Sequence, residues 1–400
     1  MSLGHAYSHN GDLGGANFDA FSRLRVSNPV TLLDSTLKYD KQETLWYEQL
    51  TAGGLSSHVY DSASASMQVA TLGDKVVRQT REYFRYQPGK SQLMLCTFNL
   101  NPNDETGGVR RRVGYFDGEN GIYVELTQAG FYVVRRSSST GSVVNTAVKQ
   151  ENWNLDSLAE LDVTKTQIFL IDLQWLGVGR VRVGFVIDGA VRYIHEFNHA
   201  NNEALVYMTT AQLPVRYEIE ATGEPLEAST LDQICAAVMS EGGVELQAGI
   251  PHSISSGAPA SVSGTRVPIL SIRPKALFGG EVNRIQTIQR AVQVINTGNG
   301  TAEVHVIWDG TLTGAAFASV EDDSTIESDV AATAVTGGHT VLSFYVPASN
   351  QAASALTTDI AGKLATTLDI DGANPTAFTI AITNHGTVDA AAAMTWQEYQ

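Results

Sequence analysis

The amino-acid sequence predicts an all-β fold, and three observations support this. Gly is common, Thr, Ser and Val recur, and charged residues make up only 17% of the 400 residues, a balance that favours sheets over helices. Short apolar runs punctuated by turn residues recur at roughly 8–12-residue spacing, which is typical of a sandwich or barrel. No stretch shows a long helical period.

The first strands follow from alternation and turn signals. Residues 75–86 alternate and end at the turn Gln87–Lys90, and residues 91–98 form the next strand. Further strands are expected at 109–116, 122–126, 131–136, 166–175 and 180–187. The pair Asp188–Gly189 predicts a two-residue hairpin into residues 190–194. The segment Leu231–Glu241 fits a helix and a buried strand equally well.

The length of the chain predicts two or three domains, because 400 residues exceed one ordinary core. Residues 244–265 are rich in Gly, Pro and Ser and are read as a linker. The expected domains are an arm at 1–35, a large sandwich at 36–243 and a smaller one of about seven strands at 266–400. In the smaller one, 290–296 and 301–308 are expected to form a hairpin through Thr297–Gly300.

The amino-terminal arm carries apolar residues that it cannot bury by itself. It is expected to anchor the protein to a larger particle through apolar side chains, with Arg23 and Arg25 on one side of the extended chain. The expected contact residues are Phe18, Phe21, Arg23, Leu24, Arg25, Leu32 and Leu33. The alternative is that the arm packs on its own sandwich as an edge strand.

Charge and composition exclude several classes of function. The net charge is −16, and between Ala291 and Gln400 one basic residue, Lys363, stands against twelve acidic ones, a balance of −11. Such a segment repels nucleic acid. No apolar run is long enough to span a membrane and no signal peptide is visible. Cys96 and Cys235 lack metal-like spacing and are read as two buried thiols.

The sharpest enzyme-like motif is His195-Glu-Phe-Asn-His199, which has the H-E-x-x-H spacing of zinc proteases. That spacing requires a helix, whereas here it ends a predicted strand, so a polar cluster at a strand end is favoured over a metal site. Asp117–Gly121 and Asp369–Asp371 are read as turns, not calcium loops. We therefore expect no catalytic residues, no metal and no cofactor.

Two basic pairs and an aromatic group are candidates for binding. Arg110 and Arg112 share one face of a strand, and with Arg135-Arg136 they could meet phosphate or a carboxylate patch on a partner. Trp46-Tyr47 and Tyr83–Tyr86 could stack on sugar, although strand alternation more simply buries half of these rings.

Segments along most of the chain resemble a family of virion structural proteins of tailed phages. The resemblance is carried by Asn17–Asp34, Arg78–Arg81, Tyr86–Gln92, Gly114–Gly121, Thr164–Phe169, Trp175–Arg182, His195–Phe197, Leu213–Ile219, Ser240–Gly243 and Asp309–Gly314. The Trp175–Gly179 phrase with its following hairpin also resembles concanavalin-like jelly rolls, a fold found in phage decoration proteins and in binders of host glycans.

The resemblance implies a non-enzymatic virion protein, assembled in the host cytoplasm. The first expectation is a capsid decoration or cement protein that clamps neighbouring shell subunits as a homotrimer, with the major capsid protein or other virion subunits as its partners. The alternative is a tail or fibre component that binds host-surface glycan through the jelly roll. No nucleic acid and no membrane are expected among its partners.

Overall fold

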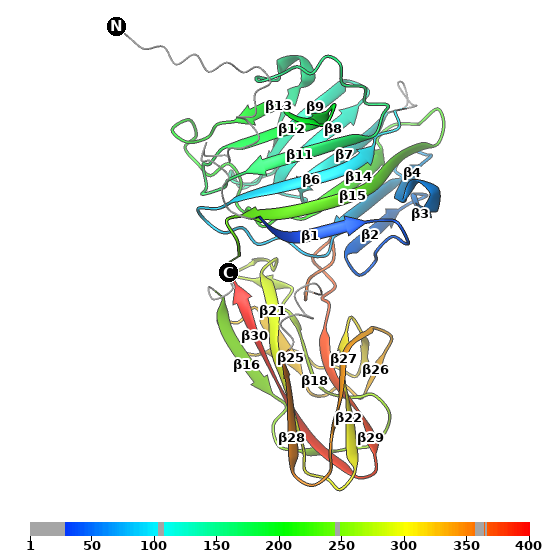
Figure 1. The fold of residues 1–400 in the computed structure, drawn as a ribbon, viewed down its shortest axis with the longest axis vertical. Coiled ribbons are helices and arrows are strands. Elements are labelled where there is room, and N and C mark those ends of the chain that lie inside the picture. Colours follow the sequence, from blue (N-terminus) through cyan, green and yellow to red (C-terminus); the bar gives the residue numbers. More distant parts are fainter. Residues whose placement is uncertain (1–28, 103–107, 245–248, 357–363, 365) are drawn as a thin grey trace. The chain divides into compact units, whose positions relative to one another are not determined.

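The computed structural model describes residues 29–102, 108–244, 249–356, 364 and 366–400 (Figure 1). The chain divides into two compact units: unit 1 comprises Met1–Thr80 and Phe84–Glu245, and unit 2 comprises Arg81–Tyr83 and Leu246–Gln400. The predicted all-β class is confirmed. Among the described residues there is no α-helix, only the short 3₁₀ turns η1 (Tyr60–Ser62) and η2 (Gln150–Asn152).

Unit 1 is a jelly-roll sandwich of two antiparallel sheets. The eight-stranded sheet runs in the order β13 (Ala190–Phe197), β12 (Val181–Ile187), β11 (Gln167–Leu173), β6 (Ser91–Asn99), β15 (Ser229–Glu241), β4 (Ser64–Val69) and β3 (Leu55–Val59), with β1 (Val30–Thr36) also paired to β15. The seven-stranded sheet runs in the order β10 (Val144–Lys149), β9 (Gly130–Ser137), β8 (Gly121–Thr127), β7 (Val109–Phe116), β14 (Val215–Ala221), β5 (Lys75–Thr80) and β2 (Trp46–Thr51).

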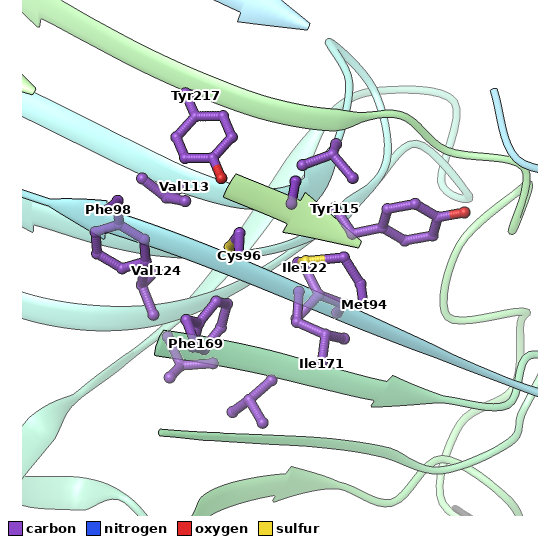
Figure 2. Close-up of a cluster of buried hydrophobic side chains, with 14 of the residues drawn as sticks. Met94, Cys96, Phe98, Val113, Tyr115, Ile122, Val124, Phe169, Ile171 and Tyr217 are labelled. Carbon is purple, nitrogen blue, oxygen red and sulfur yellow. The ribbon is translucent and has the colours of Figure 1, made fainter. Parts of the chain in front are cut away.

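The core of unit 1 lies between these sheets and is built by alternate residues of each strand. Figure 2 shows Met94, Cys96 and Phe98 of β6 among side chains from the opposite sheet, all of them almost fully buried. Cys96 and Cys235 are free thiols, as expected, although Cys235 is only half-buried. Burial raises the pKa of the Cys96 thiol, which favours its neutral form.

The segment Leu231–Glu241, for which helix and strand were both open, is the strand β15. Its burial alternates along most of its length, and it pairs with β4, β6 and β1. The Asp188–Gly189 hairpin is confirmed: both residues have positive φ, 50° and 79°, which a type I′ turn requires, and β12 pairs with β13 across it.

The end of the predicted arm belongs to the sandwich. Val30–Thr36 pairs with β15 as the strand β1, so the expected boundary at residue 35 falls inside a strand of unit 1. Leu33 is 6% exposed within the core, and Leu32 packs against that core. For Leu33 the expected contact with the particle is replaced by burial in its own core, whereas Leu32 is only half-buried and its contact with the particle stays a prediction. Phe18, Phe21, Arg23, Leu24 and Arg25 lie outside the described residues.

Unit 2 is a second antiparallel sandwich. One sheet runs β16 (Ile250–Ser255), β30 (Val388–Tyr399), β21 (Gln286–Asn296) and β28 (Gln351–Leu356), with β17 (Ala260–Val262) paired to β30. The other runs β24 (Ala318–Ser319), β25 (Ile326–Asp329), β18 (Val267–Pro274), β29 (Phe378–His385), β22 (Thr301–Trp308) and β27 (His339–Val346). Two small ribbons pair β19 (Leu277–Phe278) with β20 (Glu281–Val282) and β23 (Thr311–Thr313) with β26 (Ala334–Thr336).

Two sequence-based expectations in this part of the chain need correction. The predicted linker 244–265 contains the strands β16 and β17, because its few apolar residues suffice to add both to the long strand β30. The predicted hairpin through Thr297–Gly300 is instead a crossing between sheets, since β21 and β22 lie in different ones. Gly300 permits this crossing: a Cβ there would lie 2.6 Å from the backbone of Gly386.

Candidate functional site

The H-E-x-x-H motif ends the strand β13 and is not helical, as the sequence indicated. Its two imidazole rings flank the ring of Phe197, with centroid separations of 4.6 Å for His195 and 6.2 Å for His199. The His195 Nδ1 accepts a hydrogen bond from the Asn154 backbone N–H at 3.2 Å, and His199 Nδ1 lies 2.5 Å from the Gly179 carbonyl oxygen. Burial lowers the pKa of both rings.

His199 instead supports the loop that follows β13. Its ring stacks on Tyr207, with centroids 3.9 Å apart and planes within 4° of parallel. The Tyr207 hydroxyl donates to the Gln174 carbonyl at 3.3 Å, and its N–H to the Gly177 carbonyl at 2.9 Å. The loop between His199 and Tyr207 is thus held at both ends.

A cleft of about 300 Å³ lies between this loop and the strands β9 and β10. Cross-strand pairing of Arg135 with Thr146 and of Ser137 with Val144 places these four side chains on one face of the ribbon. The cleft is lined by Arg135, Ser137, Ser139, Thr140, Val144, Thr146, Glu203, Ala204, Leu205 and Tyr207.

One ion pair crosses the cleft. The Arg135 guanidinium binds the Glu203 carboxylate, lies 3.4 Å from the Thr146 hydroxyl, and covers the ring of Phe197 at 5.9 Å. Its Nε is buried without a hydrogen-bond partner among the described residues. The Glu203 carboxylate is 31% exposed against 16% for the Arg135 side chain, so it is the more accessible half of this ion pair.

The remaining walls combine hydroxyl and apolar groups. Ser137 and Ser139 share a hydrogen bond of 2.9 Å between their hydroxyls. Val144 and Leu205 are 48% and 53% exposed, so both offer apolar surface to a ligand. A concave site with a few polar groups on an apolar wall is the usual form of a small-molecule site. Sequence reasoning singled out Arg135 alone among these residues, because Glu203 and Leu205 lie in a loop without periodicity.

Arg110 and Arg112 lie on the outer face of the seven-stranded sheet, as alternation predicted, but they meet carboxylates of their own unit. Arg110 pairs with Glu220, and Arg112 binds Glu125 at 2.6 Å and Glu218 at 3.1 Å. The expected role in binding a partner is therefore replaced, for these two residues, by ion pairs within the sheet.

Glu218 is the centre of this charged network. It is 1% exposed and is also bound by Arg216 at 2.6 Å and by Lys75 at 3.4 Å. Burial by itself would raise the pKa of Glu218, but the charges of Arg216, Lys75 and Arg112 outweigh it and lower the pKa to about 2. Three cations around one carboxylate make this cluster a structural element of the sheet.

The proposed sugar-stacking aromatics are mostly core residues. Trp46, Phe84 and Tyr86 are 2%, 1% and 7% exposed, and only Tyr47 is half-buried.

The turn interpretation of the acidic motifs agrees with the contacts: Asp117 accepts from the backbone N–H groups of Glu119 and Asn120, and Asp369 from that of Ala373. In the described part of the chain, no helix is long and apolar enough to cross a membrane.

Comparisons with known proteins give only distant likeness. No family model matches, and no curated protein does. A legume lectin-like domain from Entamoeba histolytica shares 9% identity over 53% of this chain and 98% of its own, with a TM-score of 0.33. Lectin II from Ulex europaeus shares 11% sequence identity, and the match covers 54% of this chain and 98% of the lectin, with a TM-score of 0.33. An endo-1,3-beta-glucanase from Streptomyces sioyaensis shares 10% sequence identity, and the match covers 52% of this chain and 94% of the glucanase, with a TM-score of 0.34. Such values carry no argument about ligand or activity.

Proposed function

We propose that this chain is a non-enzymatic structural component of a tailed-phage virion, and that its jelly-roll unit binds a host-surface saccharide in the cleft between β9, β10 and the 203–207 loop. The phage assignment rests on the sequence resemblance. The saccharide assignment rests on one observation: a cleft of about 300 Å³ that combines Ser and Thr hydroxyls, an ion pair and exposed apolar side chains.

The chemistry of the cleft suits a sugar. The hydroxyls of a saccharide both donate and accept hydrogen bonds. The Ser137 and Thr146 hydroxyls and the Arg135–Glu203 pair can form such bonds with them. Its C–H faces need apolar surface, which Leu205 and Val144 supply. Because the ion pair is internally neutralised, a neutral sugar enters without leaving a buried charge unpaired.

The test is direct binding by the purified full chain. We expect an array of host-surface glycans to give a defined set of ligands, with titration calorimetry confirming the strongest. Leu205→Arg places a long cation in the cleft and should weaken that binding at least tenfold. Leu72→Arg, at a residue that is 55% exposed and outside the cleft, is the matched control and should bind as wild type. Absence of any ligand, or equal loss in both variants, refutes the proposal.

A capsid decoration role is the second candidate, favoured by an apolar corner of unit 1. Leu50 and Leu55 are 49% and 59% exposed and flank the Gly53 turn, whose N–H donates to Asp74 at 2.8 Å. Asp74 also accepts from the N–H groups of Ala70 and Thr71, which holds this corner rigid. Exposed apolar surface of this kind suits a contact with a neighbouring subunit.

Particle imaging separates the two candidates. A decoration protein occupies many equivalent shell positions, and Leu50→Ser with Leu55→Ser should release it from the shell while leaving it folded. A glycan binder occupies the tail or a fibre at low copy number. In either role we propose a homotrimer, and light scattering of the purified protein that shows monomer alone would contradict that assignment.

A further inference from the structure

Unit 2 brings together three potential metal ligands that no sequence motif connects. His252 comes from β16, and Glu321 and Asp323 come from the loop between β24 and β25. One donor atom from each lies within 4.8 Å of the other two. The His252 Nδ1 is 3.1 Å from the Glu321 Oε2.

The histidine ring is held in place by its surroundings. His252 is 7% exposed, and its ring stacks on Trp396, the residue opposite it on β30, with centroids 6.1 Å apart and planes 20° from parallel. The buried Nε2 has no hydrogen-bond partner among the described residues and faces the Glu398 Oε1 at 4.0 Å. With the proton on Nε2, the Nδ1 lone pair points toward the two acids.

Glu398 links the histidine to the loop that carries the acids. This carboxylate is fully buried and accepts hydrogen bonds from the Ser324 hydroxyl at 2.6 Å, the Thr325 N–H at 2.7 Å and the Trp396 Nε1–H at 2.7 Å. Glu398 therefore fixes Trp396, on which the His252 ring stacks, relative to the loop that carries the acids.

Among the described residues, no Lys or Arg side chain forms an ion pair with Glu321 or Asp323. Lys275 is bonded to this loop, but its ammonium binds the carbonyl oxygens of Glu321 at 3.0 Å and Ser324 at 2.5 Å, not a carboxylate. Among the described residues, His252 is the only ion-pair partner of Glu321, and Asp323 has none.

We propose that His252 Nδ1, Glu321 and Asp323 bind one divalent transition-metal ion, with Zn²⁺ as the first candidate, and that stacking on Trp396 holds the His252 ring for this purpose. One imidazole nitrogen with two carboxylates is a donor set that Zn²⁺ uses, whereas Ca²⁺ and Mg²⁺ prefer oxygen alone. Three protein ligands leave a position for water. Binding ties β16 to the loop before β25 and thereby stabilises unit 2.

The test uses the metal-free, untagged full chain and ZnCl₂ as the probe. Calorimetry should show one Zn²⁺ per chain. Glu321→Gln and Asp323→Asn each change an exposed carboxylate, so both variants should fold, and each should bind Zn²⁺ at least tenfold more weakly. Asp322→Asn removes the same charge from the same loop and is the matched control, expected to bind as wild type.

Further measurements identify the site and the metal. Co²⁺ in place of Zn²⁺ should give visible absorption that Asp323→Asn abolishes and Asp322→Asn retains. Glu303→Gln, beside His385 and His305 elsewhere in unit 2, should leave Zn²⁺ binding intact. The proposal is overturned if wild type takes up no Zn²⁺, if Asp322→Asn and Asp323→Asn weaken binding equally, or if Ca²⁺ binds more tightly than Zn²⁺.

Discussion

Replacing Glu218 by Gln tests the charged network on the seven-stranded sheet. The neutral side chain has nearly the same shape but leaves Arg112, Arg216 and Lys75 without their shared carboxylate. Breaking a buried ion pair from one side costs about 3–5 kcal/mol, because the remaining charges stay buried and uncompensated. Glu218 is 1% exposed, so screening by water does not reduce this cost.

The pKa of Glu218 gives a second route to the magnitude. Its value falls from 4.5 to about 2, and at about 1.4 kcal/mol per pKa unit this corresponds to about 3–4 kcal/mol of folding free energy at neutral pH. Because the folded-state pKa is the lower one, this stabilisation is complete above pH 4.5 and disappears as the pH falls through 2. Both routes give a cost of a few kcal/mol.

The assay is urea unfolding followed by peptide-resolved hydrogen exchange, which reports unit 1 separately from unit 2. At pH 7, Glu218→Gln should lower the unfolding free energy of unit 1 by about 3 kcal/mol. Glu220→Gln, two residues along the same strand, removes a pair that is 26% exposed and should cost less than about 1 kcal/mol. Near pH 2 the difference between Glu218→Gln and wild type should vanish. Equal costs for both variants, or a cost independent of pH, refute the reasoning.

Three further outcomes follow from burial. Leu33→Ala should destabilise unit 1 by about 2–5 kcal/mol, as a cavity in its core, whereas Leu72→Ala should change its unfolding free energy by less than about 0.5 kcal/mol. Iodoacetamide should modify Cys235 in the native protein before Cys96, whose thiol becomes reactive only on unfolding; simultaneous labelling contradicts this. His195→Ala with His199→Ala should leave Zn²⁺ stoichiometry unchanged, and loss of zinc in that variant would contradict the assignment of the motif to the loop.

The features that were predictable from sequence are those that local chemistry determines. The Asp188–Gly189 hairpin needs positive φ at both residues, which this pair tolerates, and apolar runs bounded by turn residues located most strands of unit 1. The ambiguity at Leu231–Glu241 could not be resolved, because an apolar run of that length is buried by either a helix or a strand. Only pairing with β4 and β6 decides between them.

The features that were missed depend on which strands become neighbours. The turn Thr297–Gly300 has the composition of a hairpin, yet its flanking strands enter different sheets, and no local signal distinguishes the two cases. The Ser- and Gly-rich segment 244–265 looks like a linker because two short strands need few apolar residues once β30 supplies their partner. In the same way, the cleft joins Arg135 to Glu203, 68 residues away.

The acids of residues 291–400 have few cationic partners within their own segment, and this supports the proposed metal site. In unit 1, Glu218, Glu125 and Glu220 each have an arginine partner, so the carboxylates are neutralised within the fold. Residues 291–400 contain one basic residue against twelve acidic ones, so neutralisation there must come from outside that segment. The three consecutive acids at 321–323 lie beside a buried imidazole, where a bound cation lowers their mutual repulsion. The excess of acidic residues is visible in the sequence. The pairing of β16 with β30 places His252 beside two of these acids, where the proposed dication would bind.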